Sequence, residues 1–134
     1  MLEENQIVDR AEEVMRTLSQ SKKMVTTSQI RKFLTAVNTV KEKISMYRME
    51  NKEENDSLPV SLQAQIKYLK GKLAYQIGRN KGDRRNGNPV EAFEKEAGLM
   101  KWIDEIKGSA KEYDKFSNYI EALVAYHKFY GGKD

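Results

Sequence analysis

The sequence contains no cysteine, one histidine and only two prolines among its 134 residues. Without cysteine, the chain can form no disulfide framework, no thiolate nucleophile and no zinc–cysteine site. The single histidine cannot supply the paired histidines of an H-E-x-x-H metal motif. We therefore expect this protein to use neither a metal ion nor a cofactor.

Long apolar runs and a targeting signal are also missing. No apolar stretch approaches the roughly 20 residues that are needed to span a bilayer. The opening residues, MLEENQIVDRAEEV, are acidic where a secretory signal peptide would be basic and then apolar. These absences predict a cytoplasmic protein that has no membrane partner.

The common catalytic patterns are absent too. The glycine-rich segment 78–87 follows a predicted helix and lacks the lysine–serine or lysine–threonine pair of a phosphate-binding loop. Neighbouring acids such as Glu12 and Glu13 point to different sides of a helix, so they do not converge on one ion. His127 is in helical phase with apolar residues such as Phe116, which favours a buried structural histidine. The sequence therefore predicts a protein that is not an enzyme.

The apolar residues that are present recur every three to four positions, which is typical of amphipathic helices. The pattern predicts five helices, over about 2–19, 26–52, 60–79, 89–107 and 109–130. The second predicted helix has the clearest apolar stripe: Ile30, Phe33, Leu34, Val37, Val40, Ile44 and Tyr47. Five such helices with short connections predict a compact all-α bundle that forms a single domain over residues 1–134.

Polar residues at the expected helix starts support these boundaries. Thr26 and Gln29 have the spacing of a capping box, and so do Ser109 and Glu112. Pro59 suits the first turn of the third helix, where its missing N–H costs nothing. Gly108 is expected to end the fourth helix.

The third predicted helix buries a row of leucines and isoleucines but also contains two glycines. The expected inward residues are Leu62, Ile66, Leu69, Leu73 and Ile77. Gly71 and Gly78 each weaken a helix by roughly 1 kcal/mol relative to alanine. They would permit either close packing against another helix or the close approach of a ligand.

Charge is distributed unevenly along this mildly basic chain, whose formal net charge is +4. Residues 1–20 contain five acids and two arginines, a net charge of −3, whereas residues 67–87 contain seven cations and one acid, a net charge of +6. Such asymmetry is a candidate electrostatic footprint for an anionic partner.

A row of tyrosines and cations lies beside the apolar stripe of the third predicted helix. Tyr68, Lys72, Tyr75 and Arg79 follow one another at i, i+4, i+7 and i+11, so they share one face. Cations neutralise phosphates, and tyrosine can stack on a base. The same spacing also suits tyrosines that flank the core with cations around them, and the sequence leaves both interpretations open.

Smaller basic surfaces occur on the second helix and at the C-terminus. Residues 31–48 contain five cations and one acid, a net charge of +4. The last helix carries Tyr119, Tyr126 and Lys128, and aromatic residues at this spacing suit the core or a self-association surface. The basic segment 80–87 is either a further phosphate contact or a flexible surface loop.

Three segments of the chain are similar to one known family. VTTSQIRKFL (25–34), YLKGKLAYQIGR (68–79) and ALVAYHKFYGGK (122–133) resemble the small subunit of type III-A CRISPR effector complexes, the Csm complexes, in the same order along the chain. The resemblance spans most of the sequence. Segment 80–90 and the acidic segment 50–57 have no counterpart in it.

The resemblance implies a helical, non-catalytic subunit whose copies stack head to tail in a filament. In this family the small subunits help to form a channel for the guide–target RNA duplex, and their basic side chains touch the target strand, while other Csm subunits carry the nuclease activities. It implies Arg31, Lys72 and Arg79 as RNA contacts, together with Tyr75. Charge and helical phase add four lysines to the predicted RNA-binding set: Lys32, Lys41, Lys70 and Lys128.

Two other functions compete with this interpretation. The chain could be a homo-oligomeric protein-interaction adaptor whose basic faces meet acidic protein surfaces. It could also be a small DNA-binding protein, although no helix-turn-helix spacing with a convincing recognition helix is visible. Binding of RNA, and its dependence on salt, separates the RNA-binding function from the adaptor function.

Overall fold

The structure is a computed structural model that describes residues 3–21, 24–51, 56–79 and 88–131. Within these ranges the chain forms α-helices and no β-strand, which confirms the all-α prediction. The helices are α1 (Glu4–Ser19), α2 (Thr27–Asn51), α3 (Val60–Arg79), α4 (Pro89–Ala97), α5 (Leu99–Ile106) and α6 (Ala110–Phe129). The expected number was five, and the difference arises between α4 and α5.

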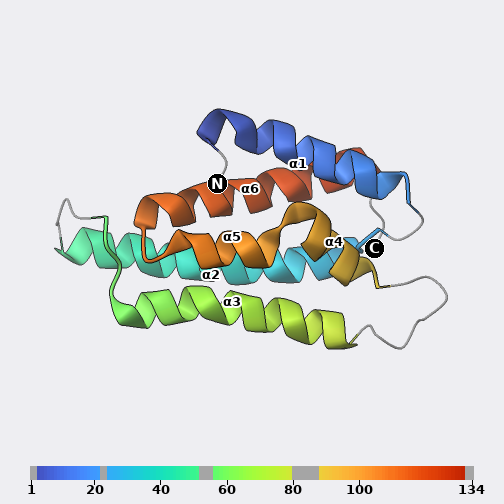
Figure 1. The fold of residues 1–134 in the computed structure, drawn as a ribbon. Coiled ribbons are helices and arrows are strands. Elements are labelled where there is room, and N and C mark those ends of the chain that lie inside the picture. Colours follow the sequence, from blue (N-terminus) through green and yellow to red (C-terminus); the bar gives the residue numbers. More distant parts are fainter. Residues whose placement is uncertain (1–2, 22–23, 52–55, 80–87, 132–134) are drawn as a thin grey trace.

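The helices pack side by side in an elongated bundle (Figure 1). The middle of the bundle is formed by α6, which contacts α1, α2 and α5. Helix α3 packs against α2, α4 and α5, whereas α1 packs against α6 and α4. As a result α1 and α3 lie at opposite edges of the bundle.

The predicted apolar stripes form the core. Five residues of the α2 stripe are buried, while Leu34 and Tyr47 are half-buried beside them. On α3 four of the five expected residues are buried and Ile77 is half-buried. An aromatic layer from α6, consisting of Tyr113, Phe116 and Tyr119, completes the interior with no exposed surface. Burial of these stripes holds the helices together, since each large apolar side chain contributes about 1.5–3 kcal/mol.

The predicted helix over 89–107 is wrong as one continuous helix, because Gly98 divides it. Gly98 has a φ of 68°, a left-handed conformation that glycine adopts without the steric cost of a Cβ. The break leaves carbonyl groups at the end of α4 without helical partners. Arg10 of α1 donates to the carbonyl oxygen of Glu96 at 2.7 Å, and Tyr119 of α6 donates to that of Ala97 at 2.9 Å.

The polar starts of the helices agree with the sequence in most respects. Thr26 and Gln29 form the complete capping box, with hydrogen bonds of 2.9 and 3.1 Å between the side chain of each and the backbone N–H of the other. Ser109 accepts from the backbone N–H of Glu112 at 3.1 Å, but the Glu112 carboxylate pairs with Lys115 instead of completing a box. Each arrangement satisfies a free N–H in a first helical turn.

The single histidine is a structural residue, as predicted. His127 is buried, and its Nε2 lies 2.6 Å from the carbonyl oxygen of Val25, just before α2. Because a carbonyl oxygen only accepts, Nε2 carries the proton. The contact ties the end of α6 to the start of α2.

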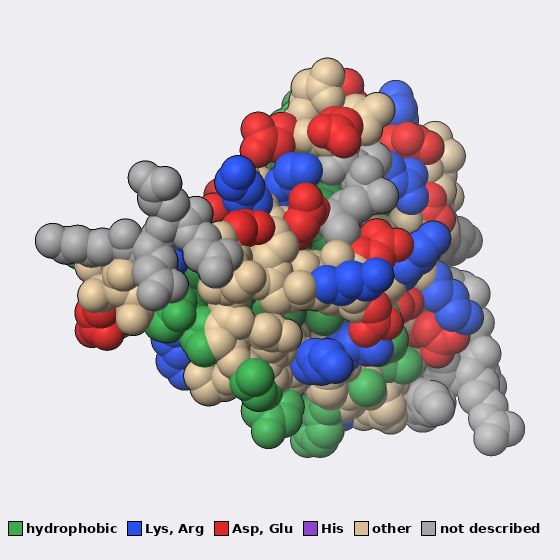
Figure 2. Space-filling view, turned by 60° about the vertical axis from the view of Figure 1, so that its left-hand side comes forward, with side chains coloured by type: hydrophobic (Ala, Val, Ile, Leu, Met, Phe, Trp, Pro, Cys, Tyr) green, Lys and Arg blue, Asp and Glu red, His purple; other side chains and the backbone are tan. Residues whose placement is uncertain are grey.

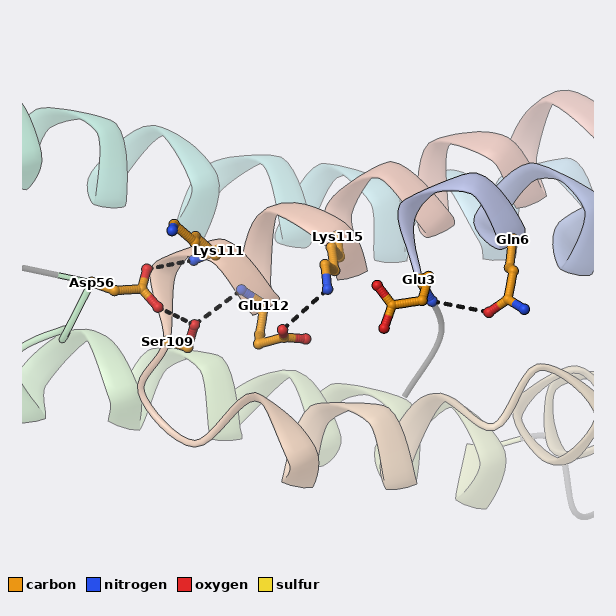
Figure 3. Close-up of polar contacts among 7 residues, drawn as sticks. All are labelled: Glu3, Gln6, Asp56, Ser109, Lys111, Glu112 and Lys115. Carbon is orange, nitrogen blue, oxygen red and sulfur yellow. Dashed lines mark hydrogen bonds and ion pairs between the residues drawn. The ribbon is translucent and has the colours of Figure 1, made fainter.

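The segment before α3 is tied to the start of α6 (Figure 3). The Asp56 carboxylate accepts from the Ser109 hydroxyl and, at 2.8 Å, from the backbone N–H of Lys111. The Leu58 N–H donates to the carbonyl oxygen of Gly108 at 2.8 Å. Burial works to raise the pKa of Asp56. Its hydrogen bonds to the Ser109 hydroxyl and the Lys111 backbone, together with the charge of Lys111, outweigh burial, so the pKa is lowered from its ordinary value of 3.8. We call the contacts of Asp56 with Ser109 and Lys111 the Asp56 clasp. The clasp holds the segment before α3 in place and so fixes where that helix begins.

Candidate nucleic-acid interface

A groove follows the line where α2 and α3 meet. Its larger part has a volume of about 580 Å³ and is lined by Lys32, Phe33, Tyr68, Gly71, Lys72, Tyr75, Gln76 and Arg79. A second hollow of about 300 Å³ adjoins it, since Lys32, Tyr68 and Lys72 line both. We call these two neighbouring hollows together the α2–α3 groove.

The packing of the two helices produces this groove. Their apolar stripes face the interior, so the residues at the margins of the stripes become its floor and walls. Phe33 forms the floor; its side chain is only 2% exposed and makes an edge-to-face contact with Phe116 of α6, with 6.4 Å between ring centroids. The floor of the groove is therefore part of the rigid core.

The walls of the groove carry two aromatic side chains that face solvent. Tyr68 is 68% exposed and Tyr75 is 69% exposed. This excludes a core role for Tyr75, which was one of the two interpretations that the spacing left open. An exposed aromatic ring beside a groove presents a face on which another flat group can stack.

The charges of the groove have one sign. Lys32, Lys72 and Arg79 are exposed, and none of the residues that line either hollow is acidic. Among the described residues, these three cations form no ion pair. Lys43, at the far end, donates to the side chain of Gln65 at 2.9 Å. A hollow whose described lining residues include cations and no carboxylate has a positive potential, which attracts anions.

The groove joins four of the eight predicted RNA-binding residues, namely Lys32, Lys72, Tyr75 and Arg79. The other four lie outside it. Arg31 and Lys128 are exposed and Lys41 is half-buried, and none of them lines the groove. Lys70 forms an ion pair of 2.8 Å with Asp104 of α5, so a neighbouring helix already holds its ammonium group.

Sequence reasoning missed two features of the site. Phe33 was assigned to the core alone, and nothing in the spacing of the α2 stripe indicated that it also lines a groove. Gly71 was predicted to permit either close packing or the close approach of a ligand, but its place on the groove wall needed the fold. The basic residues Lys81, Arg84 and Arg85 lie outside the described residues.

Figure 2 shows how side chains of different kinds gather on one face of the molecule. Hydrophobic side chains collect at its lower edge, over α3, with basic side chains beside them. Acidic and basic side chains are intermixed over the upper part, where α1 lies. Charges of both signs are therefore spread over much of this face.

The described part of the chain contains no group of three or more histidine, aspartate and glutamate side chains placed to hold a metal ion. None of its helices is both long and apolar enough to cross a membrane. The α2–α3 groove, by contrast, combines two exposed tyrosines with exposed cations.

Fold and groove together define a small all-helical protein with a cationic, aromatic surface. The family model described as Csm2 Type III-A matches residues 2–133. The Csm2 protein of the CRISPR system of Streptococcus thermophilus is 33% identical over 137 residues, covering 100% of this chain and 98% of that protein. Csm2 of Enterococcus italicus is 31% identical over 108 residues, covering 79% and 68%, and Csm2 of Mycobacterium tuberculosis (strain H37Rv) is 29% identical over 124 residues, covering 91% and 90%.

The chain therefore belongs to the type III-A Csm2 family. This confirms the resemblance to the Csm small subunit that three segments of the sequence indicated. Two of those segments, 25–34 and 68–79, contribute the two sides of the α2–α3 groove.

Proposed function

We propose that this protein is the non-catalytic small subunit of a type III-A CRISPR interference complex and that it binds the target RNA strand through the α2–α3 groove. Within that complex, which acts in the cytoplasm, the protein associates with the guide–target duplex and with the backbone and large Csm subunits. Membership of the Csm2 family supports the assignment to such a complex. The single observation that supports RNA binding is the groove itself, whose cations have no acidic neighbour among its lining residues.

The groove suits a ligand recognised by its backbone. Lys32, Lys72 and Arg79 can each approach a phosphate, and such contacts position a nucleic acid without reading its sequence. In a guided complex, base pairing to the guide carries the sequence information. A subunit of this kind therefore needs cations at a fixed place more than it needs base-specific side chains.

The remaining predicted residues have a secondary part in this proposal. Arg31, Lys41 and Lys128 lie elsewhere on the surface and would touch RNA only where it extends beyond the groove. Lys70 would have to leave Asp104 first, and exchanging one exposed ion pair for a phosphate gains little. We therefore expect the four residues of the groove to dominate binding.

Binding to unstructured single-stranded RNA across a salt series tests this function. Lys72→Ala/Arg79→Ala removes two cations of the groove, and Lys101→Ala/Lys111→Ala is a matched control that removes two exposed cations from α5 and α6. Each lost phosphate contact on a single strand reduces the salt slope by about 0.7, so the groove variant should lose about 1.4. The control should retain more of the wild-type slope.

The same series separates RNA binding from the adaptor function. Equal slopes for the two variants would contradict a site at the groove. Absence of RNA binding at low salt, both for the isolated chain and for the assembled complex, would favour an adaptor that meets acidic protein surfaces. The non-catalytic role is tested in a complex that is rebuilt with the groove variant. If this complex, once bound to target RNA, retains its nuclease activity, the non-catalytic role is supported.

Head-to-tail stacking of copies is part of the proposal. Within α1, four acids and two arginines give a net charge of −2, whereas α3 carries four cations and no acid. Since the two helices lie at opposite edges of the bundle, parallel copies can place α1 of one beside a basic face of the next. Such a heterologous contact does not close on itself and extends into a filament.

A further inference from the structure

We infer that the α2–α3 groove holds unpaired bases, stacked between Tyr68 and Tyr75, in addition to binding phosphates. This inference rests on the proposed function and assigns the aromatic part of the groove, which phosphate binding alone does not use. The chemical class of the ligand is a single-stranded purine or pyrimidine nucleotide segment.

The spacing of the two tyrosines supports a stacked ligand. They are seven residues apart on one face of α3, which at a rise of about 1.5 Å per residue is a separation of about 10.5 Å along the helix. Stacked bases repeat every 3.4 Å or so along a strand. Two bases between two tyrosine rings need three such intervals, which is close to the available length.

Gly71 keeps the space between the tyrosines open. It lies in α3 between Tyr68 and Tyr75 and lines the groove. A Cβ built at this position would meet nothing within 4 Å, so no neighbouring element requires a glycine there. Its φ is not in the left-handed region, so the backbone does not require glycine either. Packing against the described part of this chain therefore does not account for Gly71, and the inference assigns to it the close approach of a ligand.

The apolar floor and the cations around it complete a site for a base with its phosphates. Phe33 offers an apolar floor that the core holds in place, and Lys32, Lys72 and Arg79 surround it. Paired bases of the guide–target duplex are already stacked and offer this groove only their phosphates, so only bases of the target strand that are left unpaired can stack between the tyrosines. Stacking is tolerant of sequence because every base has a π face. The site therefore discriminates single-stranded from paired segments without discriminating between sequences.

Comparison of two ligands of equal charge tests the inference. The probes are a short oligoadenylate and an abasic ribose–phosphate strand of the same length. Wild type should bind the oligoadenylate at least about fivefold more tightly, and Tyr68→Ala or Tyr75→Ala should each lose about fivefold for the oligoadenylate alone. Tyr→Phe variants at both positions should retain binding, and Phe129→Ala, which removes an equally exposed ring from α6, should leave it unchanged.

Substitution of Gly71 separates the site from folding. Gly71→Leu places a side chain in the groove but favours the helix, so it should raise the urea midpoint of unfolding while it weakens oligoadenylate binding. Equal affinity of wild type for the two probes, unchanged by the tyrosine variants, would overturn base stacking and leave phosphate binding intact. If wild type binds neither probe at low salt, both as the isolated chain and in the assembled complex, the proposed function is overturned as well.

Discussion

The Tyr119 hydroxyl donates a hydrogen bond of 2.9 Å to the carbonyl oxygen of Ala97, the last residue of α4. The tyrosine is fully buried, and its ring stacks on Trp102 of α5 with 4.5 Å between ring centroids. One side chain of α6 therefore holds both helices that Gly98 separates. The broken helix keeps a fixed shape because each of its two parts has its own attachment to the core.

Replacing Tyr119 with phenylalanine should destabilise the fold. The substitution retains the ring but leaves the Ala97 carbonyl oxygen buried without that donor, which costs about 1–3 kcal/mol. Urea unfolding followed by circular dichroism measures the loss. Tyr126→Phe, at a half-buried tyrosine of the same helix, is the control and should change the midpoint far less. An unchanged midpoint for Tyr119→Phe would show that the hydrogen bond does not stabilise the fold.

Alkaline pH should weaken the fold through the same residue. Burial raises the pKa of Tyr119 to about 12, above the ordinary value of 10.0 in the unfolded chain. The stabilising contribution is then fully present below pH 10 and is lost as the pH rises from there toward 12. Unfolding midpoints measured over this range should fall. The fall should be smaller in Tyr119→Phe, although Tyr113 retains part of it because burial also raises its pKa.

Acid pH should weaken the clasp at Asp56. Its pKa is lowered from 3.8 by hydrogen bonds to Ser109 and Lys111, so its contribution is present above 3.8 and is lost as the pH falls through the folded value. Asp56→Asn should therefore lower stability at neutral pH and reduce the loss on acidification. Unfolding midpoints measured at neutral and acid pH check both changes, and parallel curves for the variant and the wild type would contradict this role.

Gly98→Ala should destabilise the protein by roughly 1–2 kcal/mol, because alanine is strained at a φ of 68°. No atom lies within 4 Å of an added Cβ, so the strain is in the backbone alone. Gly78→Ala, in helical backbone of α3, is the control and should stabilise. If residues 89–107 formed one continuous helix, Gly98→Ala would instead stabilise the protein. Chemical unfolding of the two variants distinguishes these outcomes.

Charge reversal on α1 should weaken assembly. Glu12→Lys/Glu13→Lys removes acids from the edge of the bundle that is opposite α3, and stacking should become less favourable. Native mass spectrometry of the rebuilt complex should then show fewer small subunits. Asp114→Lys/Glu121→Lys makes the same change in net charge on exposed positions of α6 and is the control. Unchanged stoichiometry in the α1 variant would remove the proposed contact.

Much of the fold could be predicted because local signals agree with packing. The stripe of α2 and the capping box at Thr26 depend on spacing alone, and the structure retains both. The break at Gly98 could not be predicted, because an isolated glycine is tolerated within a helical pattern. Only the backbone conformation reveals that this glycine, unlike Gly71, ends a helix.

The candidate site was partly predictable for a related reason. Helical phase grouped Tyr75 with Lys72 and Arg79 on one face of α3, and the structure places all three at the groove. Helical phase could not decide whether Tyr75 was buried, because its burial depends on how closely α2 packs against that part of α3. Nor could it reveal that Lys70 meets Asp104, since 34 residues separate them in the chain.

The placement of α1 and α3 at opposite edges gives the bundle a transverse electric dipole, with its negative end at α1 and its positive end at α3. In the field of a polyanion, such a molecule experiences a torque that turns α3 toward the charge before any contact forms. The field of the polyanion thus orients the protein as well as attracting it. The benefit fades as the ionic strength rises and the Debye length becomes shorter than the width of the bundle.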